Sequence, residues 1–361
     1  MENKKQEQFN IKTLSPVHIG DGNKITKLDY LLEGKSLTVL SFDELISLLN
    51  ENEINELTKS IERNENLDFS IIRKYLSKIK RYTVNSYINN LNLNKEIHQF
   101  IKTSDYKPYI PGSEIKGAIR TSILYKILKD NWDILKDTIT DENKKNEITY
   151  LKNNAANHLE NKVFGNIKND VMKFFLVEDT QTIDSVNLTV EEIKIFNSRK
   201  RFTEYAECLK ENTLVKNIKI KIERINPKME NPVFKNYPYK DYLLNWKNCA
   251  YEYSKDLIIV EKDYWRDRNQ NIYSFLEKLE KENSSETPLL RIGRFTGKLS
   301  HTIVILLKIK ELNKELKADR RIFPKTRRLT SDNKLLGWIK FTENNTEDSK
   351  PTMTKEEIKK N

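Results

Sequence analysis

Hydrophobic and polar residues alternate near the N-terminus of the chain, and this pattern predicts its first elements. The alternation over residues 9–13 is typical of a strand, which a loop containing proline and glycine ends at 15–22. Apolar runs at 28–32 and 36–40 flank a glycine and predict a pair of short strands. The capping-box sequence of residues 41–44 predicts the start of a helix.

The middle of the chain is predicted to be mostly helical. Residues 50–101 are polar with apolar residues at mixed spacings, and we interpret them as a largely helical insertion. A Pro-Gly turn at 111–112 stops this segment, and Ser113 is the predicted N-cap of an amphipathic helix. The inward-facing stripe of that helix is Ile115, Ala118, Ile119, Ser122, Ile123 and Ile127. The charged, Asn-rich residues 130–160 predict a second helical insertion.

The second half of the chain mixes strand and helix patterns. Residues 173–177 predict a buried strand, and residues 214–222 alternate as another strand does. The aromatic, mixed-charge residues 230–285 predict helices with loops, and residues 336–339 predict a terminal strand. The polar tail, residues 343–361, is predicted to be disordered.

This order of elements predicts an α+β fold with antiparallel sheets. The economical interpretation is two ferredoxin-like modules of the RNA-recognition type with largely helical insertions. The first module spans residues 8–185 and carries the insertions at about 50–101 and 130–160. The second spans residues 186–342 and carries a glycine-rich loop and a basic loop.

The positive charge of the chain is concentrated near its C-terminal end. The 361 residues carry a formal net charge of +11, and the segment from Arg291 to Lys340 alone holds 14 Lys and Arg against four Asp and Glu. A coding bias toward lysine accounts for a high lysine count, but it leaves the gathering of arginine unexplained. This distribution favours a surface that faces a polyanion.

Other functional classes are disfavoured by what the chain contains. Cys208 and Cys249 form no CxxC pair, and no Cys/His spacing fits a structural zinc, so we expect buried thiols in a reducing compartment, no metal and no cofactor. Residues 1–8 are polar, unlike a secretory signal, and the longest apolar run, residues 303–307, is too short to span a membrane. We therefore expect a cytoplasmic protein without a membrane partner.

Three segments carry candidate chemistry, and the first is residues 107–120. Its Pro-Gly turn delivers a helix N-terminus whose N–H groups are suited to an anion. Lys116 and Arg120 lie four residues apart on one face of the first turns, where bound phosphate would offset their unfavourable position in the helix dipole. The alternative is an ordinary solvated face.

The second candidate segment is the loop around Gly293 and Gly297, in a chain that has only nine glycines. Glycine permits sharp turns and close approach of the backbone. The spacing of the two glycines, with three residues between them, fits neither a Walker loop nor the dinucleotide-binding fingerprint. Phosphate could contact the neighbouring cations and a base could stack on the aromatic ring. These neighbours are Arg291, Arg294, Phe295 and Lys298. The alternative is an ordinary turn.

The third candidate segment is the basic loop at residues 323–330. Lys325, Arg327 and Arg328 surround Thr326, which is the arrangement of a phosphate clamp. The alternative is an exposed basic loop without a ligand.

Taken together, these segments resemble the RAMP superfamily of CRISPR effector proteins. The residues that carry the resemblance are Leu14-Ser15-Pro16-Val17-His18-Ile19-Gly20-Asp21-Gly22, Tyr109-Ile110-Pro111-Gly112-Ser113-Glu114-Ile115-Lys116-Gly117-Ala118-Ile119-Arg120-Thr121, Arg291-Ile292-Gly293-Arg294-Phe295-Thr296-Gly297, and Pro324-Lys325-Thr326-Arg327-Arg328-Leu329 with Leu336-Gly337-Trp338. The second is specific to the superfamily. The last is similar to the ending of the subunit that caps the 3′ end of the guide RNA in type III-A (Csm) complexes.

The resemblance implies binding of CRISPR guide RNA without base specificity, which suits contacts to phosphates and 2′-hydroxyls. It also implies contact with the backbone RAMP subunit and the small helical subunit of the Csm complex, and recruitment of host nucleases that trim the guide 3′ end. The implied phosphate ligands are Lys116, Arg120, Arg291, Arg294, Lys298, Lys325, Arg327 and Arg328, with Phe295 or Tyr109 as stacking residues and His18, Gly293, Gly297 and His301 in the contacting loops.

Whether the protein is an enzyme depends on its four histidines. A metal-free ribonuclease needs a general base and a general acid near the 2′-hydroxyl, and His18 and His301 both lie in candidate loops. His98 and His158 fall in polar segments and are expected at the surface. The favoured hypothesis is a non-catalytic guide-RNA cap in which both loop histidines donate hydrogen bonds. The alternatives are a repeat-RNA endoribonuclease and the subunit that caps the guide's 5′ handle.

Overall fold

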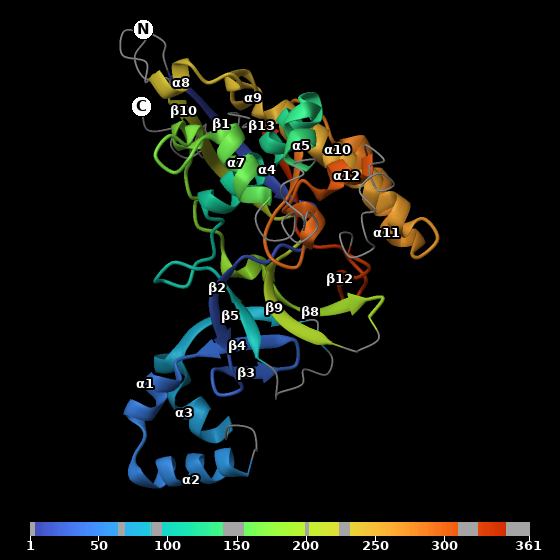
Figure 1. Cartoon of the computed structure of the whole chain (residues 1–361). Helices are drawn as coiled ribbons and strands as arrows, with labels where there is room; N and C mark the ends of the chain where they lie inside the picture. The colour runs from blue at the N-terminus through green and yellow to red at the C-terminus, as the bar shows by residue number, and fades with distance from the viewer. Residues whose placement is uncertain are drawn as a thin grey trace, which may run out of the picture.

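The chain combines helices with two β-sheets, which confirms the predicted α+β class (Figure 1). The computed structural model describes residues 4–63, 69–86, 88, 96–139, 155–198, 202–223, 232–309 and 324–343. The predicted disordered tail therefore lies outside the described residues, apart from its first residue.

One sheet has five strands and only antiparallel neighbours, in the order β11-β13-β1-β10-β7. Its strands are β1 (Lys4–Thr13), β7 (Phe175–Val177), β10 (Leu214–Glu223), β11 (Leu289–Arg291) and β13 (Trp338–Glu343). The predicted strands at 9–13, 214–222 and 336–339 are found here. The strand predicted at 173–177 is shorter, because the 3-10 turn η1 (Val171–Phe174), capped by the Asp170 side chain, precedes it.

This sheet has the strand order of a ferredoxin-like unit. α4 (Gly112–Asp130) lies between β1 and β7 in the chain, and α10 (Trp246–Trp265) lies between β10 and β13. The two helices pack together, with the Tyr125 and Tyr253 rings edge to face at 5.1 Å between centroids. In the core beside β1, the ring of Phe9 meets Trp246 at 5.6 Å and Phe341 at 5.7 Å.

The other sheet has eight strands, with seven in the order β2-β6-β9-β8-β5-β4-β3 and β12 paired with β8. They are β2 (Gly20–Ile25), β3 (Tyr30–Glu33), β4 (Ser36–Leu40), β5 (Lys80–Ser86), β6 (Ile97–Phe100), β8 (Leu188–Phe196), β9 (Thr203–Leu209) and β12 (Arg327–Thr330). The predicted pair at 28–32 and 36–40 is the hairpin β3–β4. The predicted modules 8–185 and 186–342 each contribute strands to both sheets.

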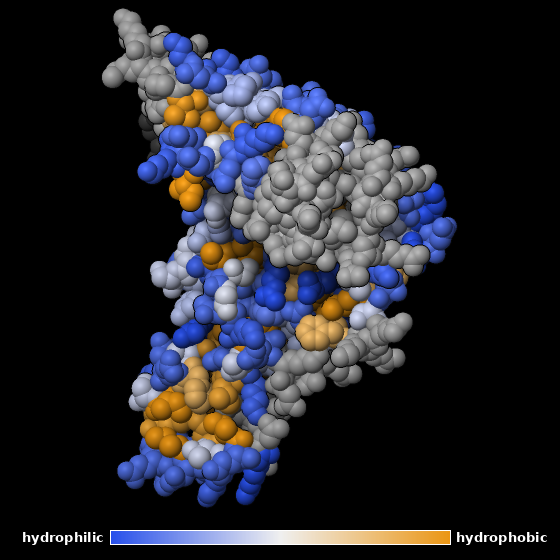
Figure 2. All heavy atoms as spheres, in the orientation of Figure 1, coloured by the Kyte–Doolittle hydropathy of each residue, from blue (hydrophilic) through white to orange (hydrophobic). Residues whose placement is uncertain are grey.

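A lobe of three helices extends from this second sheet (Figure 1). They are α1 (Phe42–Leu48), α2 (Glu51–Glu62) and α3 (Phe69–Ile79), which share a small core of their own. The Ser41 side chain accepts a hydrogen bond from the Glu44 N–H, as the capping sequence predicted. Figure 2 shows hydrophobic residues over this lobe, and hydrophilic residues in the hollowed middle of the same face.

The helical interpretation of residues 50–101 is only partly correct. Helices α2 and α3 occupy its first part, but β5 and β6 occupy its end. The buried side chains of β5 alternate at Tyr82, Val84 and Ser86, a strand pattern that the surrounding polar residues obscured.

The remaining helices agree with the predictions where the structure describes them. α5 (Trp132–Ile139) and α7 (Ala155–Phe164) lie in the predicted insertion at 130–160, whose middle is outside the described residues. The region 230–285 forms α8 (Pro232–Lys235), α9 (Lys240–Leu244) and α11 (Gln270–Glu282) besides α10, and α12 (Val304–Ile309) follows. Among the described helices, none has the length and apolar character needed to cross a membrane.

Candidate nucleic-acid interface

Three segments that are far apart in the sequence meet at one junction between the sheets. The Arg294 N–H donates to the His18 carbonyl at 2.9 Å, which joins the glycine-rich loop to the loop after β1. The Gly337 N–H donates to the Pro16 carbonyl at 2.8 Å, and the Ile292 N–H donates to the Gly337 carbonyl at 2.8 Å. The loop after β1, the glycine-rich loop and the segment around Gly337 therefore form a single structural unit.

Glycine is required in this junction because the chain packs against itself. Gly293 has φ +79°, and a Cβ atom there would lie 2.3 Å from the His18 carbonyl oxygen. Gly337 has φ +90°, and a Cβ atom there would lie 2.1 Å from the Thr296 Cγ2. The expected close approach at Gly293 is thus to the protein's own backbone. Gly297, with φ +87°, faces open space and remains available to a ligand.

Four of the predicted RNA contacts are buried, so their side chains do not form part of an exposed phosphate-binding surface. Relative exposure is 0% for His18, 3% for Arg291, 3% for Phe295 and 7% for Arg327. Spacing did not reveal this, because a loop motif does not tell which of its side chains point inward.

Arg327 is held by the protein rather than available to phosphate. Its Nε donates to the carboxylate of Glu261 on α10 at 2.9 Å, and its Nη1 donates to the Pro324 carbonyl at 2.8 Å. The Glu261 side chain is 1% exposed, so this is a buried ion pair. The guanidinium also lies 4.1 Å from the centroid of the Tyr264 ring. Arg327 therefore ties β12 to α10.

Arg291 is equally enclosed, at the end of β11. Its Nε donates to the Leu336 carbonyl at 2.8 Å, and its guanidinium lies 5.5 Å from a ring centroid of Trp338. Burial lowers the pKa of Arg291 to about 10. Its Nη1 atom is buried without a hydrogen-bond partner among the described residues.

Phe295 supports the exposed arginines instead of offering a free stacking face. The ring packs against His18 at 5.3 Å, and the residue has φ +71°, which is unusual for a bulky side chain. The guanidinium of Arg294 lies 4.9 Å from the ring centroid and that of Arg328 lies 5.6 Å from it. Tyr109, the other candidate stacking residue, is half-buried.

Four predicted cations reach the surface around the glycine-rich loop. The side chains of Arg294 and Arg328 are 51% and 40% exposed, and Lys298 and Lys325 are also exposed. Arg294 and Arg328 share the carboxylate of Glu204 on β9, at 3.3 Å and 3.6 Å. This carboxylate holds the two guanidiniums close to the Phe295 ring.

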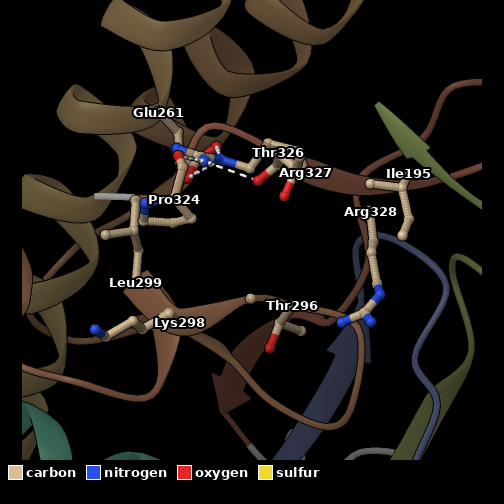
Figure 3. Close-up of a pocket in the computed structure, with 10 residues that line it drawn as sticks. Ile195, Glu261, Thr296, Lys298, Leu299, Pro324, Thr326, Arg327 and Arg328 are labelled. Carbon is tan, nitrogen blue, oxygen red and sulfur yellow. Dashed lines mark hydrogen bonds and ion pairs between the residues drawn. The ribbon is translucent and has the colours of Figure 1, made fainter. Parts of the chain in front are cut away.

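A hollow of about 190 Å³ separates the glycine-rich loop from the basic loop. Figure 3 shows Thr296 and Lys298 on one wall and Pro324 and Thr326 on the other. The Arg328 guanidinium lies near Thr296, whereas Arg327 turns away to Glu261 (Figure 3). The second and third candidate segments thus face each other across a hollow to which Lys298 and Arg328 contribute positive charge.

The first candidate segment is arranged differently from the prediction. α4 begins at Gly112, with Pro111 as N-cap, and Ser113 lies within the helix. The Gly112 N–H donates to the Asp179 carboxylate at 2.7 Å, so a residue of the chain takes the place expected for an anion. The buried stripe was predicted correctly, except that Ala118 is only half-buried.

Arg120 is the clearest correction in α4. It forms ion pairs with Glu160 at 3.0 Å and Asp170 at 2.8 Å, and its guanidinium lies 4.3 Å from the Phe164 ring centroid. Two carboxylates neutralise this cation. Lys116 is half-buried, and burial lowers its pKa. The face of α4 predicted to bind phosphate therefore offers less free positive charge than its sequence implies.

The two histidines of the catalytic hypothesis are held apart. His18 is buried, its Nδ1 lies 2.6 Å from the Glu207 carbonyl, and burial lowers its pKa to about 4. His301 instead places its Nε2 2.6 Å from the Thr296 hydroxyl, and burial lowers its pKa. No contact joins the two rings in the described part of the chain. This geometry does not support a His18–His301 acid–base pair.

Sequence reasoning missed the carboxylates that organise the site. Glu204 contacts both exposed arginines and also His98, at 3.0 Å, and burial lowers the pKa of His98. His98 lies in β6 and is half-buried, not on a helix surface as expected, whereas His158 is exposed on α7 as expected. Glu204 and Glu261 lie far along the chain from their partners, so no local signal identifies them. Among the described residues, no cluster of His, Cys, Asp and Glu could hold a metal ion.

Comparisons with known proteins agree with this architecture. The model of the RAMP superfamily matches residues 10–300. A Methanocaldococcus jannaschii protein named CRISPR system Cms protein Csm5 is 26% identical over 378 residues, covering 91% of this chain and 87% of that protein. A Streptococcus thermophilus protein of the same name is 26% identical over 133 residues, covering 32% of this chain and 37% of that protein.

Two solved structures have the same fold as this chain. One chain of a cryo-EM structure of a Csm–crRNA–target RNA ternary complex of a type III-A CRISPR-Cas system gives a TM-score of 0.71 at 24% identity, covering 93% of this chain and 100% of that chain. The crystal structure of T. onnurineus Csm5 gives a TM-score of 0.69 at 22% identity, covering 91% of this chain and 99% of that chain.

Proposed function

The chain belongs to the RAMP superfamily, and on that premise we propose that it is a guide-RNA-binding subunit of a type III-A Csm complex. Its role there is to cap the 3′ end of the guide RNA and to support maturation of that end. The names of the relatives support membership of the complex, since the longer match covers 87% of a protein named Csm5.

The observation that carries the proposal is the group of exposed cations on the two loops that flank one hollow, of which Lys298 and Arg328 line the hollow itself. Arg294, Lys298, Lys325 and Arg328 surround the glycine-rich and basic loops, with Glu204 in contact with the two arginines. Cations that contact the RNA backbone bind without reading its sequence, which is what a subunit that accepts any guide requires. The partners follow from the complex: the backbone RAMP subunit, the small helical subunit and host nucleases that trim the guide, in the cytoplasm.

We propose a non-catalytic role. His18 is buried with its Nδ1 bound at the Glu207 carbonyl, and the His301 Nε2 is bound at the Thr296 hydroxyl, so neither ring is presented to an RNA backbone as a general base or acid needs to be. The endoribonuclease remains the alternative enzyme, and cleavage of repeat RNA by the purified protein would establish it. The 5′-handle cap remains the alternative binding role. It is tested by determining which end of the guide RNA crosslinks to this subunit.

The first test is the salt dependence of RNA binding by the triple variant R294A/K298A/R328A. Each lost phosphate contact is expected to reduce the slope of log K against log salt by about 0.7 for single-stranded RNA, equally for unrelated sequences. The matched control is R73A/R266A/K278A, which removes three side chains that are 66%, 62% and 71% exposed elsewhere. Equal slopes for the triple variant and this control would contradict the proposed interface.

A further inference from the structure

A second hollow, distinct from that of Figure 3, is lined by α4 and the glycine-rich loop. Its volume is about 440 Å³, and Glu114, Gly117, Arg291, Arg294 and His301 are among its lining residues. Pockets that enclose small ligands begin at about 300 Å³, so this space is large enough for one nucleotide. None of the exposed cations of the basic loop lines it.

Arg291 lines this hollow and has an unused donor. The side chain is 3% exposed, and its Nη1 atom has no acceptor among the described residues. A buried guanidinium N–H without an acceptor is unfavourable, and a turn of the side chain toward an anionic oxygen in the hollow would satisfy it. Arg294, whose side chain is 51% exposed, supplies a second cation beside it.

Glu114 gives the same hollow an acceptor. Its carboxylate makes no ion pair or side-chain hydrogen bond among the described residues. Its negative charge favours the protonated form of His301, whereas the positive charge of Arg291 disfavours it. An ionised carboxylate accepts hydrogen bonds and repels anions. A ligand that fits both sides must carry an anionic group near the arginines and a hydroxyl group near Glu114.

An RNA end has this combination. We propose that the hollow binds the 3′-terminal nucleotide, with its 5′-side phosphate on Arg291 and Arg294 and its ribose hydroxyl groups donating to Glu114. Carboxylates bind ribose hydroxyls in this way in dinucleotide sites. Because Glu114 repels a second anion, the hollow selects ends that carry free hydroxyls over ends that carry a 3′-phosphate. This inference rests on the proposed RNA-binding function and adds a preference for the chemistry of the end.

Gly117 provides a way to close the hollow without disturbing the fold. It is exposed on α4, and a Cβ atom there meets nothing within 4 Å. Gly117→Leu therefore fills the hollow from the helix side, while Gly117→Ala is the matched control that leaves most of the space. Glu114→Gln keeps the size of the side chain and removes its charge.

The experiment measures the affinity of the full-length chain for one RNA sequence in four forms: 3′-hydroxyl, 3′-phosphate, 2′-deoxy at the last nucleotide, and circular. The wild type and G117A are expected to bind the 3′-hydroxyl form about tenfold more tightly than the 3′-phosphate and circular forms. G117L is expected to bind all four forms equally, and E114Q is expected to lose the discrimination against the 3′-phosphate.

The outcomes separate this inference from the proposed function. Equal wild-type affinity for the circular and 3′-hydroxyl forms would overturn the inference, since an internal nucleotide would then fill the hollow. An end preference that survives in G117L would also overturn it. Failure of the RNA-binding proposal gives a different result: the variant R294A/K298A/R328A would then leave the salt dependence of binding unchanged for all four forms of the RNA.

Discussion

Neighbouring arginines on β12 point in different directions and have different environments. Arg327 is 7% exposed and paired with the buried Glu261, whereas the Arg328 side chain is 40% exposed. Successive side chains of a strand face opposite sides of the sheet, which accounts for the difference. The two adjacent arginines are therefore expected to have separate roles, Arg327 in stability and Arg328 in the proposed RNA binding.

This difference gives a prediction for a matched pair of variants. Arg327→Ala leaves the Glu261 carboxylate buried and unpaired, so we expect the free energy of unfolding to fall by about 3–5 kcal/mol. Arg328→Ala removes a partly exposed pair and is expected to cost less than about 1 kcal/mol, while it weakens RNA binding. Denaturant titration and RNA-binding assays on both variants check this. An Arg327→Ala protein of wild-type stability would contradict the account.

His18 predicts how stability depends on pH. Its pKa is lowered from 6.5 to about 4 by burial, so the unfolded chain binds the proton more tightly than the folded chain between these values. The stability due to neutral His18 is complete above about pH 6.5 and falls as the pH drops toward 4, by up to about 1.4 kcal/mol per pH unit. His98 and His301, whose pKa values are also lowered, add to the same trend.

The variant His18→Gln isolates this contribution. It removes the titrating ring and is expected to flatten the fall of the melting temperature between pH 6.5 and pH 4, although its stability at pH 7 is lower. Thermal melts of both proteins across this range measure the effect. Parallel curves would show that His18 does not titrate with the lowered pKa.

At the scale of elements, glycine in α4 and glycine in the glycine-rich loop have opposite roles. Gly117 is exposed within a helix, where alanine is preferred by about 0.5–1 kcal/mol, and its Cβ position is open. At Gly293 the left-handed φ and the nearby His18 carbonyl both exclude a side chain. Each glycine belongs to one of the motifs found in the sequence, but only the loop glycine has a backbone conformation and surroundings that exclude a side chain.

This comparison gives a test with two alanine variants. Gly117→Ala is expected to raise the free energy of unfolding slightly, and Gly293→Ala is expected to lower it by at least about 1–3 kcal/mol because the loop must move away from His18. Chemical denaturation of the two proteins checks both signs. Equal stabilities would show that the loop does not need the conformation described here.

The elements themselves could be predicted where the hydrophobic pattern is local. The alternation in β1, the capping residue Ser41 and the buried stripe of α4 each belong to one continuous segment, and each was predicted. β5 was missed because its short alternation is obscured by polar neighbours, and its pairing with β4 and β8 leaves no local signal. The partners of the arginines could not be predicted for the same reason, since Glu261 lies on α10 and Glu204 on β9.

At the scale of the whole molecule, the N-terminal strand and the C-terminal strand lie side by side in one ferredoxin-like sheet. β1 pairs with β13, and the loop after β1 meets both the glycine-rich loop and Gly337. The candidate interface is therefore assembled only when both ends of the chain are folded together. A single sequence motif identifies the superfamily, but the site exists only in the folded whole.

The central claim, a cap on the 3′ end of the guide, is tested most directly by UV crosslinking of end-labelled guide RNA in the assembled complex. The account predicts a crosslink close to the 3′ end in the wild type, its loss in R294A/K298A/R328A and its retention in R73A/R266A/K278A. A crosslink close to the 5′ end, or a 3′ crosslink that persists in the first variant, would contradict it.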